Sequence, residues 1–259
     1  MRRLRRRAVV ASLVCILATG VGVSGAGAQT PAVPRTPDGK PDFSGIWQVM
    51  NAAAWDIQDH TAQKGVPAGI GVVVGNEIPY TPEALARKRQ NYENRATADP
   101  ETKCYLPGVP RIMYTPYPFQ IFQKPQQLTM LFEYVHATRY VYTNGTPHPP
   151  GHIDWWMGDS RGRWDGDTLV VDVVDFNEDT WFDRAGNFHS DELHLVERFT
   201  LLDADHVNYE VTVEDPKVFS RPWRMSMIFY RHKEKNSQLL DYDCFGFDSE
   251  FHPPVPQSR

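Results

Sequence analysis

The sequence predicts a mainly β protein, built as a single antiparallel barrel of about nine or ten strands. Short segments rich in Val, Ile, Leu, Phe and Tyr recur along most of the chain after residue 118. Turn signals such as Asp165-Gly166 separate these segments at short intervals. Strands and helices do not alternate, which excludes a parallel nucleotide-binding sheet. A β-sandwich is the alternative, because it contains the same succession of short strands.

Residues 1–28 have the features of a secretory signal peptide. Five arginines precede an apolar stretch of small residues, and Ala26-Gly27-Ala28 fits a cleavage site before Gln29. Cleavage would remove five positive charges from a chain of net charge −5, leaving 231 residues of net charge −10, enough for one large domain. We therefore expect a bacterial periplasmic or secreted protein that binds no nucleic acid and does not insert into a membrane.

Two cysteines remain after cleavage, because Cys15 leaves with the signal peptide. In an oxidising compartment an even pair most simply forms one disulfide, so we expect a Cys104–Cys244 bond. In the chain-entropy model, closing so long a loop stabilises the fold by about 4–5 kcal/mol. A catalytic thiol is the alternative. The sequence contains no Cys-x-x-Cys pair, so a thiolate zinc site is not expected.

The barrel domain is expected at 42–248. A Pro-rich, extended lead-in at 29–41 precedes it, and a tail at 249–259 that we expect to be disordered follows it. The first strand begins at Gly45-Ile46-Trp47. The apolar, Gly-rich stretch from Gly65 to Gly75 is expected to form an ordered loop that covers a cavity mouth.

A single substantial helix is expected from Thr81 to about Ala96. Thr81 is suited to cap the helix, Pro82 to its first turn, and Glu83 to the positive end of its dipole. Prolines between Cys104 and 118 then forbid helix and indicate a rigid extended segment. The later β-segments are expected at 119–123, 127–135, 138–143, 154–164, 167–175, 192–202, 206–214, 223–231 and 238–245.

A set of short motifs covers most of residues 37–245. They are Pro37-Asp38-Gly39-Lys40-Pro41-Asp42-Phe43-Ser44-Gly45-Ile46-Trp47, Cys104 with Pro107-Gly108-Val109-Pro110-Arg111, Gly158-Asp159-Ser160, Gly166-Asp167-Thr168-Leu169-Val170-Val171-Asp172, His189-Ser190, Val196-Glu197-Arg198, and Asp215-Pro216 with Pro222-Trp223. On these motifs the chain resembles a family of secreted acidobacterial and proteobacterial proteins of unassigned function. The resemblance implies export and a shared fold, but no reaction.

The Gly45-Ile46-Trp47 motif also resembles the Gly-x-Trp motif at the start of lipocalin barrels, where the tryptophan closes the barrel floor. Together with the strand count, this resemblance implies a calycin-like barrel. Barrels of about eight to ten strands can hold one small ligand inside. An interior cavity is therefore the expected place for a functional site.

The segment 192–199 contains the densest set of ionisable groups. Strand side chains alternate, so Glu197 shares one face with Leu193 and Phe199, while His194 and Arg198 share the other. If the first face is core, Glu197 is a buried acid that needs a partner. If the second face lines a cavity, His194 and Arg198 project into it. An exposed face or a structural ion pair is the non-functional alternative.

Other groups are candidates for acid–base chemistry. His189 is a possible general base paired with Asp183 or Asp179, although His189-Ser190-Asp191 cannot form a serine-hydrolase triad because neighbouring strand residues point apart. His136 and Arg139 lie between two strands. His148 and His152 have ligand types that suit zinc, but a Pro-rich loop separates them, so no metal is expected.

Aromatic residues are numerous enough to line an apolar pocket, with core packing as the alternative. No phosphate-binding loop is present, so no nucleotide cofactor is expected. We expect no other cofactor either. The candidate ligand-binding residues are Trp155, Trp156, Trp181, Tyr134 and Tyr140.

Two functions follow from these observations. The first is a cofactor-independent enzyme of the lyase, hydratase, isomerase or hydrolase type, acting on a small hydrophobic or aromatic molecule inside the barrel. Its expected residues are His189 or His194 as base, Glu197 or Asp183 as orienting acid, and Arg198 or Arg139 as oxyanion stabiliser. The second is a non-catalytic, lipocalin-like carrier. The sequence identifies neither the substrate nor the oligomeric state.

Overall fold

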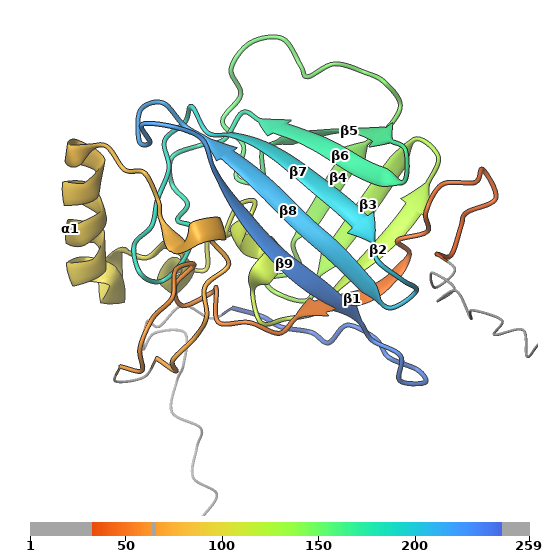
Figure 1. Cartoon of the computed structure of the whole chain (residues 1–259), viewed down its shortest axis with the longest axis horizontal. Helices are drawn as coiled ribbons and strands as arrows, with labels where there is room; N and C mark the ends of the chain where they lie inside the picture. The colour runs from red at the N-terminus through yellow and green to blue at the C-terminus, as the bar shows by residue number, and fades with distance from the viewer. Residues whose placement is uncertain (1–32, 64–65, 245–259) are drawn as a thin grey trace, which may run out of the picture. The chain divides into compact units, whose positions relative to one another are not determined.

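The fold is a closed barrel of nine strands, as predicted (Figure 1). The computed structural model describes residues 33–63 and 66–244, so the predicted signal peptide and tail lie outside the described residues. Each strand pairs with the next in sequence, and the last pairs with the first. The strands are β1 (Gly45–Val49), β2 (Phe119–Lys124), β3 (Gln127–Phe132), β4 (Thr138–Tyr142), β5 (Asp159–Asp165), β6 (Thr168–Val174), β7 (His194–Leu201), β8 (His206–Glu214) and β9 (Trp223–Arg231).

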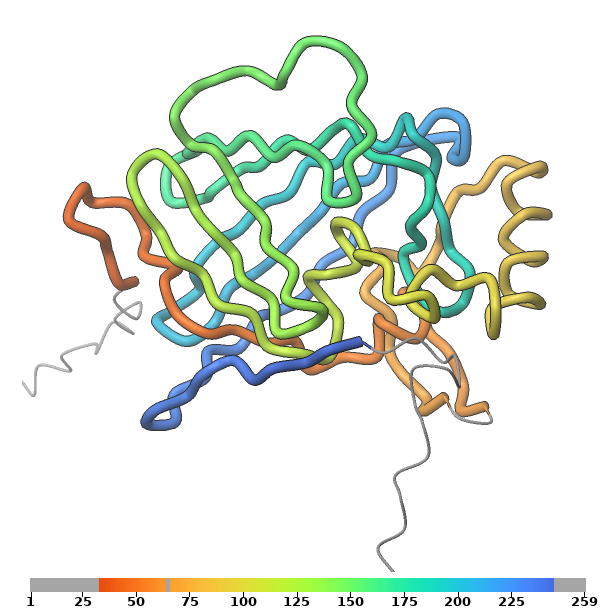
Figure 2. Tube along the Cα trace, turned by 180° about the vertical axis from the view of Figure 1, so that it is seen from behind, coloured from red at the N-terminus to blue at the C-terminus, as the bar shows by residue number. Residues whose placement is uncertain are grey.

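One neighbouring pair, β4 and β5, is parallel, which corrects the prediction of a purely antiparallel barrel. Around a closed ring the strand direction must return to its starting sense, so the number of antiparallel pairs is even. Nine strands therefore require at least one parallel pair. The segment 143–158 provides it, because it is long enough to carry the chain back along the barrel as parallel strands require. Figures 1 and 2 show this segment as a wide green arc outside the strands.

The turn signals at Asp165-Gly166 and Asp203-Ala204-Asp205 do join antiparallel neighbours. They connect β5 to β6 and β7 to β8. Gly166 has a φ of 59°, a left-handed conformation that glycine adopts without steric cost. Asn144-Gly145, by contrast, begins the crossover rather than a hairpin. Asp-Gly and Asn-Gly dipeptides thus both mark turns, but neither determines which strand the following segment pairs with.

Helix α1 (Pro82–Ala98) begins where the capping residues predict. The Thr81 hydroxyl accepts a hydrogen bond from the Ala84 amide at 3.2 Å. Its residues are mostly exposed, and among the described residues it is the only α-helix. Figure 2 shows α1 at one end of the barrel, together with the 51–76 segment and the 176–191 loop. Short 3₁₀ turns complete the structure: η1 (Val74–Asn76), η2 (Pro100–Lys103) and η3 (Arg111–Tyr114).

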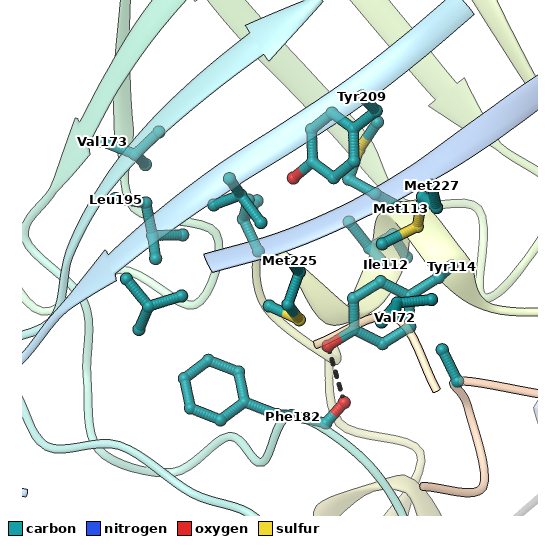
Figure 3. Close-up of a cluster of buried hydrophobic side chains, with 14 of the residues drawn as sticks. Val72, Ile112, Met113, Tyr114, Val173, Phe182, Leu195, Tyr209, Met225 and Met227 are labelled. Atoms are coloured by element: carbon teal, nitrogen blue, oxygen red, sulfur yellow. Dashed lines mark hydrogen bonds between the residues drawn. The ribbon is translucent and has the colours of Figure 1, made fainter. Parts of the chain in front are cut away.

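The barrel interior is filled by side chains. Inward positions alternate along β7 and β8, where Leu195, Phe199, Tyr209 and Val211 leave at most 1% of their surface accessible. From η3, Ile112, Met113 and Tyr114 are equally buried. Figure 3 draws them in one cluster with residues of β6 to β9. Trp47 on β1 is fully buried, as its motif implies.

The C-terminal segment departs from the prediction, because residues 238–244 form no strand. The reason is closure: β9 already pairs with β8 on one side and β1 on the other, so no edge remains for a tenth strand. The segment instead lies against the residues after β3. Tyr242 forms a single bridge to Tyr134 and stacks on its ring at 5.6 Å.

The predicted disulfide is present. Cys104 and Cys244 are bonded, with their Cα atoms 5.5 Å apart and 140 positions apart in sequence. The bond fastens the C-terminal segment beside η2. At the other end of the domain, the segment 33–41 folds back on itself rather than extending, and Arg35 donates two hydrogen bonds to Asp167 in the β5–β6 turn. No helix among the described residues has the length and apolar character needed to cross a membrane.

Candidate ligand pocket

Glu197 points into the barrel core, which is the first of the two orientations that the alternation allowed. Both it and Arg139 on β4 are almost inaccessible to solvent. Arg139 Nη1 donates to Glu197 Oε1 at 3.0 Å, and a second bond joins Nη2 to Oε2. Tyr209 donates to Oε1 at 2.7 Å, and Ser160 Oγ accepts from Arg139 Nε at 3.1 Å. The two charges neutralise each other, and their remaining polar atoms bond Tyr209 and Ser160, as buried charges require. The ion pair therefore stabilises the barrel core and does not line a cavity.

The pKa values of this network agree with that role. Burial disfavours the charged form of Arg139, but the facing Glu197 carboxylate outweighs it and raises the arginine pKa. Burial, with Glu197 nearby, raises the pKa of Tyr209 well above its ordinary value. The arginine therefore stays charged and the phenol stays protonated.

His194 and Arg198 lie on the outer face of β7, so the expectation that they project into a cavity is wrong. His194 Nε2 bonds Asp172 Oδ2 at 3.0 Å on β6, and its Nδ1 lies 3.4 Å from Glu214 on β8. Arg198, with 42% of its side chain exposed, bonds Asp165. Both residues form ion pairs across the barrel wall. They lie outside because side chains alternate along β7 and the apolar residues on its other face form the core.

His189 is buried, and its partners are not the predicted aspartates. Its Nδ1 donates to the Ser190 carbonyl at 2.8 Å, so Nε2 carries no proton and accepts from the Thr180 hydroxyl at 2.6 Å. Burial lowers the histidine pKa and favours this neutral form. Asp179 is exposed. With both ring nitrogens engaged inside the protein, His189 has no free atom for a ligand.

Asp183 anchors loops rather than orienting a histidine. Its carboxylate accepts from the amides of Ile57, Ala185 and Asn187, and from the Asn187 side chain at 2.6 Å. Burial and the neighbouring Asp56 raise its pKa to about 7, although these donors act in the opposite direction. The group ties the 51–57 segment to the 176–191 loop.

The remaining predicted residues do not gather in one place. His136 is half exposed and bonds Asp243 at 2.8 Å. Tyr140 lies on the outer face, 49% exposed. Trp155 forms a backbone β-bridge with Phe176, and Trp181 forms one with Phe188. The ring centres of Trp156 and Tyr105 lie 5.0 Å apart. Of the predicted ligand-binding aromatics, Tyr134 alone lines the pocket described next.

His148 fastens the crossover segment to the barrel wall, whereas His152 bonds a carboxylate of the segment itself. His148 bonds Asp159 Oδ2 at 2.6 Å and Asp172 Oδ1 at 2.9 Å, while His152 bonds Asp154 at 2.9 Å. Each ring therefore faces its own carboxylates rather than the other ring. In the described part of the chain, no three His, Cys, Asp or Glu side chains converge as a metal site would require.

A pocket of about 670 Å³ lies outside the barrel, at the end where α1 sits. We call it the rim pocket. It is formed by five separate segments: residues 55–63 with Val66, the C-terminal half of α1 with η2, Tyr134 after β3, the Arg184-Ala185 turn, and residues 242–244. Its lining residues are Trp55, Asp56, His60, Gln63, Val66, Tyr92, Glu93, Arg95, Ala96, Asp99, Glu101, Thr102, Tyr134, Arg184, Ala185, Tyr242, Asp243 and Cys244.

An ionic network forms one wall of the rim pocket. Arg111 is 2% exposed and bonds Asp99 through both Nη atoms. Its Nη2 also bonds Glu101 at 2.8 Å, and Arg184 holds the same Glu101 with two bonds of 2.6 Å. Despite burial, Asp99 and Glu101 raise the pKa of Arg111. Two arginines and two acids thus neutralise one another and give a rigid wall.

Two buried polar atoms on the pocket wall have no hydrogen-bond partner among residues 33–63 and 66–244. They are Tyr134 Oη and His60 Nε2. Tyr134 is only 1% exposed. His60 Nδ1 donates to the Gln58 carbonyl at 2.9 Å, and its Nε2 lies beside Gly69. An unsatisfied buried group costs about 1–3 kcal/mol, so the fold gives up stability at both positions.

Asp56 is the third group that the wall leaves open. One of its oxygens accepts from the Gln58 amide at 2.9 Å, but it forms no salt bridge with any residue in the described ranges. Burial raises its pKa, and the charges of Lys88 and His60 offset part of that rise. A carboxylate in this position would be stabilised by a positive charge inside the pocket.

Sequence reasoning missed Asp56, His60 and Trp55, because they lie in a segment without period-two or helical periodicity. One signal was available: the Gly-rich residues after 65 indicate a loop over a cavity mouth, and these three precede it directly. The pocket was expected inside the barrel, however, and no local pattern reveals that five distant segments meet at its rim.

The comparisons with known proteins add nothing to this geometry. No model of a protein family, no curated protein and no solved structure matches the chain. The resemblance to secreted bacterial proteins therefore stays a prediction, and the function is argued from the chain's own residues.

Proposed function

We propose that this protein is exported and binds a small organic molecule in the rim pocket. The gathering of aromatic rings and polar side chains from separate segments around one pocket is the observation that carries the proposal. The pocket volume of about 670 Å³ is within the range of about 300–1,000 Å³ that small-molecule sites occupy.

The chemistry of the lining suits such a ligand. Trp55, Tyr92 and Tyr242 offer apolar ring surfaces, while Asp56 and His60 offer polar atoms that would fix its orientation. This combination of apolar walls and a few convergent polar groups is typical of cofactor and substrate sites. The barrel interior offers no comparable space, because its inward side chains already pack against one another. The barrel acts as the rigid frame for a site at its end.

Export is supported by the disulfide, since such bonds persist in oxidising compartments. It is supported further by the signal-like composition of residues 1–28. We therefore place binding in the periplasm or outside the cell. The ligand would then be a molecule met in that compartment.

Acid–base turnover of the ligand is a second candidate, favoured by His60. Within the described residues it is the one histidine of the pocket lining, and its Nδ1 donates to the Gln58 carbonyl. A histidine beside a bound substrate can exchange a proton with it. A carrier would return its ligand unchanged, whereas an enzyme would release a product of different structure.

The test fills the pocket from an exposed position. Ala96 lies on α1 and lines the pocket, whereas Ala86 is exposed on the same helix and does not. We expect Ala96→Phe to weaken binding at least tenfold and Ala86→Phe to leave it unchanged. Binding is measured by equilibrium dialysis against a panel of small cationic, neutral and anionic aromatic compounds, with circular dichroism as the control for folding.

Failure of every compound to bind the wild-type protein below about 1 mM would contradict the proposal. So would equal binding by Ala96→Phe and wild type, because the ligand would then sit elsewhere. Mass spectrometry of the recovered compounds separates the two candidates: unchanged compounds indicate a carrier, and converted ones indicate an enzyme.

A further inference from the structure

We propose that the ligand of the rim pocket is a protonated organic amine with an aromatic or apolar body. This inference rests on the proposed function and narrows it to one chemical class. Three independent properties of the described residues lead to it: the kind of hydrogen bond still open, the balance of charge, and the nature of the walls.

The Asp56 carboxylate is the open hydrogen-bonding position of the pocket wall. A carboxylate only accepts, and the bond from the Gln58 amide leaves lone pairs of Asp56 free. A ligand that bonds these lone pairs must donate, and an ammonium group carries up to three N–H donors.

The charge balance points the same way. Five acidic side chains and two arginines line the pocket. Arg184 is neutralised by its two bonds to Glu101, and Arg95 is engaged with Tyr92, lying over its ring and donating to its carbonyl at 2.6 Å. Asp56, which burial holds partly out of water, forms no salt bridge in the described part of the chain. A cation bonded to it would add a counter-charge to those of Lys88 and His60.

The walls suit the body of such a molecule. Aromatic faces attract cations, and two rings of the pocket already show this behaviour. The Arg184 guanidinium lies 4.2 Å from the Trp55 ring centre, and the Arg95 guanidinium lies 4.0 Å from that of Tyr92. Tyr242 and Tyr134 stack at 5.6 Å and present a further aromatic surface. An aliphatic or aromatic amine could pack its carbon skeleton against these rings.

The experiment uses three compounds of nearly equal size that differ in charge: 2-phenylethylamine, 2-phenylethanol and phenylacetate. Their affinities for the wild-type protein are measured by isothermal titration calorimetry at pH 7. We expect the protonated amine to bind at least tenfold more tightly than the alcohol, and phenylacetate to bind most weakly.

Asp56→Asn then tests the named group. The substitution keeps the oxygen that the Gln58 amide bonds and removes only the charge. We expect it to weaken binding of the amine at least tenfold and binding of the alcohol less than twofold, a difference that a merely structural role would not produce. Asp179→Asn, an exposed residue outside the pocket, is the matched control and should change neither affinity.

The outcomes separate this inference from the proposed function. Binding of the alcohol or phenylacetate as tight as that of the amine would overturn the amine assignment and leave a pocket that binds other ligands. An equal loss of both affinities in Asp56→Asn would overturn it as well. If none of the three compounds binds and the wider panel also fails, the proposed function itself falls. The wild-type comparison decides the question even if the variant does not fold.

Discussion

At the scale of single residues, the alternation of side chains on β7 decides which ionisable groups are structural. Glu197 shares a face with Leu195 and Phe199, so the core that buries them must also bury the acid. Burial is tolerated only because Arg139 and Tyr209 bond its carboxylate from other strands. The sequence predicted a partner for Glu197, but only the closed barrel determines that Arg139 is that partner.

We expect Glu197→Gln to destabilise the protein strongly. Arg139 would remain buried and charged with no carboxylate opposite, and breaking a buried pair in this way costs about 3–5 kcal/mol. Urea denaturation measures the free energy of unfolding. Glu210→Gln, at a partly exposed outer position of β8, is the control and should change it by less than about 0.5 kcal/mol. Equal effects of the two substitutions would mean that the buried pair contributes nothing specific.

At the scale of elements, ion pairs on the outer wall connect three neighbouring strands. Asp172 on β6, His194 on β7 and Glu214 on β8 lie in one row, and His148 of the crossover segment joins them through Asp172. The hydrogen bond with Asp172 raises the pKa of His194. The bond with His194 in turn lowers the pKa of Asp172. Stability therefore depends on pH through this row.

The sign of that dependence follows from the two directions. The raised pKa of His194 gives a contribution that is complete below its unfolded value of about 6.5 and is lost as the pH rises through the folded value. The lowered pKa of Asp172 gives a contribution present above about 3.9 and lost as the pH falls through the folded value. Between these limits both contributions are present. Because both side chains are at least a third exposed, the effect is small, about 0.2–1 kcal/mol.

We expect His194→Gln to lower the free energy of unfolding most between about pH 4 and 6.5, and progressively less above it. Urea denaturation of both proteins at a series of pH values measures the difference, and high salt should reduce it. A difference between the two proteins that stays constant from pH 5 to pH 9 would contradict the assignment.

The elements also show what local patterns could and could not predict. Seven of the eight strands after α1 were expected within three residues of their observed bounds, because period-two alternation and turn residues are local signals. The other, β5, was expected from residue 154 and begins at Asp159. The parallel pairing of β5 with β4 was not predicted. The direction of β5 depends on which end of the barrel the crossover segment reaches, and its composition does not determine that. The tenth strand, at 238–245, failed for a similar reason. Its residues suit a strand, but β1 occupies the edge that it would need.

At the scale of the whole molecule, the disulfide connects the fold to the candidate site. Cys244 and Tyr242 both line the rim pocket, and the bond to Cys104 holds them there. The pocket is assembled from segments that are remote in sequence, which is why no motif predicted it. The two cysteines were predictable from their number and compartment alone, although their closeness to the pocket was not.

We expect the Cys104→Ser/Cys244→Ser double variant to lose both stability and binding. Removing a bond across 140 residues should lower the free energy of unfolding by about 4–5 kcal/mol in the chain-entropy model. Binding of 2-phenylethylamine should weaken because the C-terminal wall is no longer fastened. Urea denaturation and calorimetry measure the two effects. The wild-type protein treated with dithiothreitol should behave like the variant, and the variant should not respond to the reagent.

The single parallel pair restricts how the barrel can change by insertion or deletion. If a two-residue turn replaced the segment 143–158, β5 would run opposite to β4, and nine successive reversals cannot close a ring. The barrel would have to open, or lose or gain a strand at the same time. The length of the crossover is therefore coupled to the strand count, although the segment makes few apolar contacts of its own. Shortened versions that still span the barrel should be tolerated, whereas hairpin replacements should not.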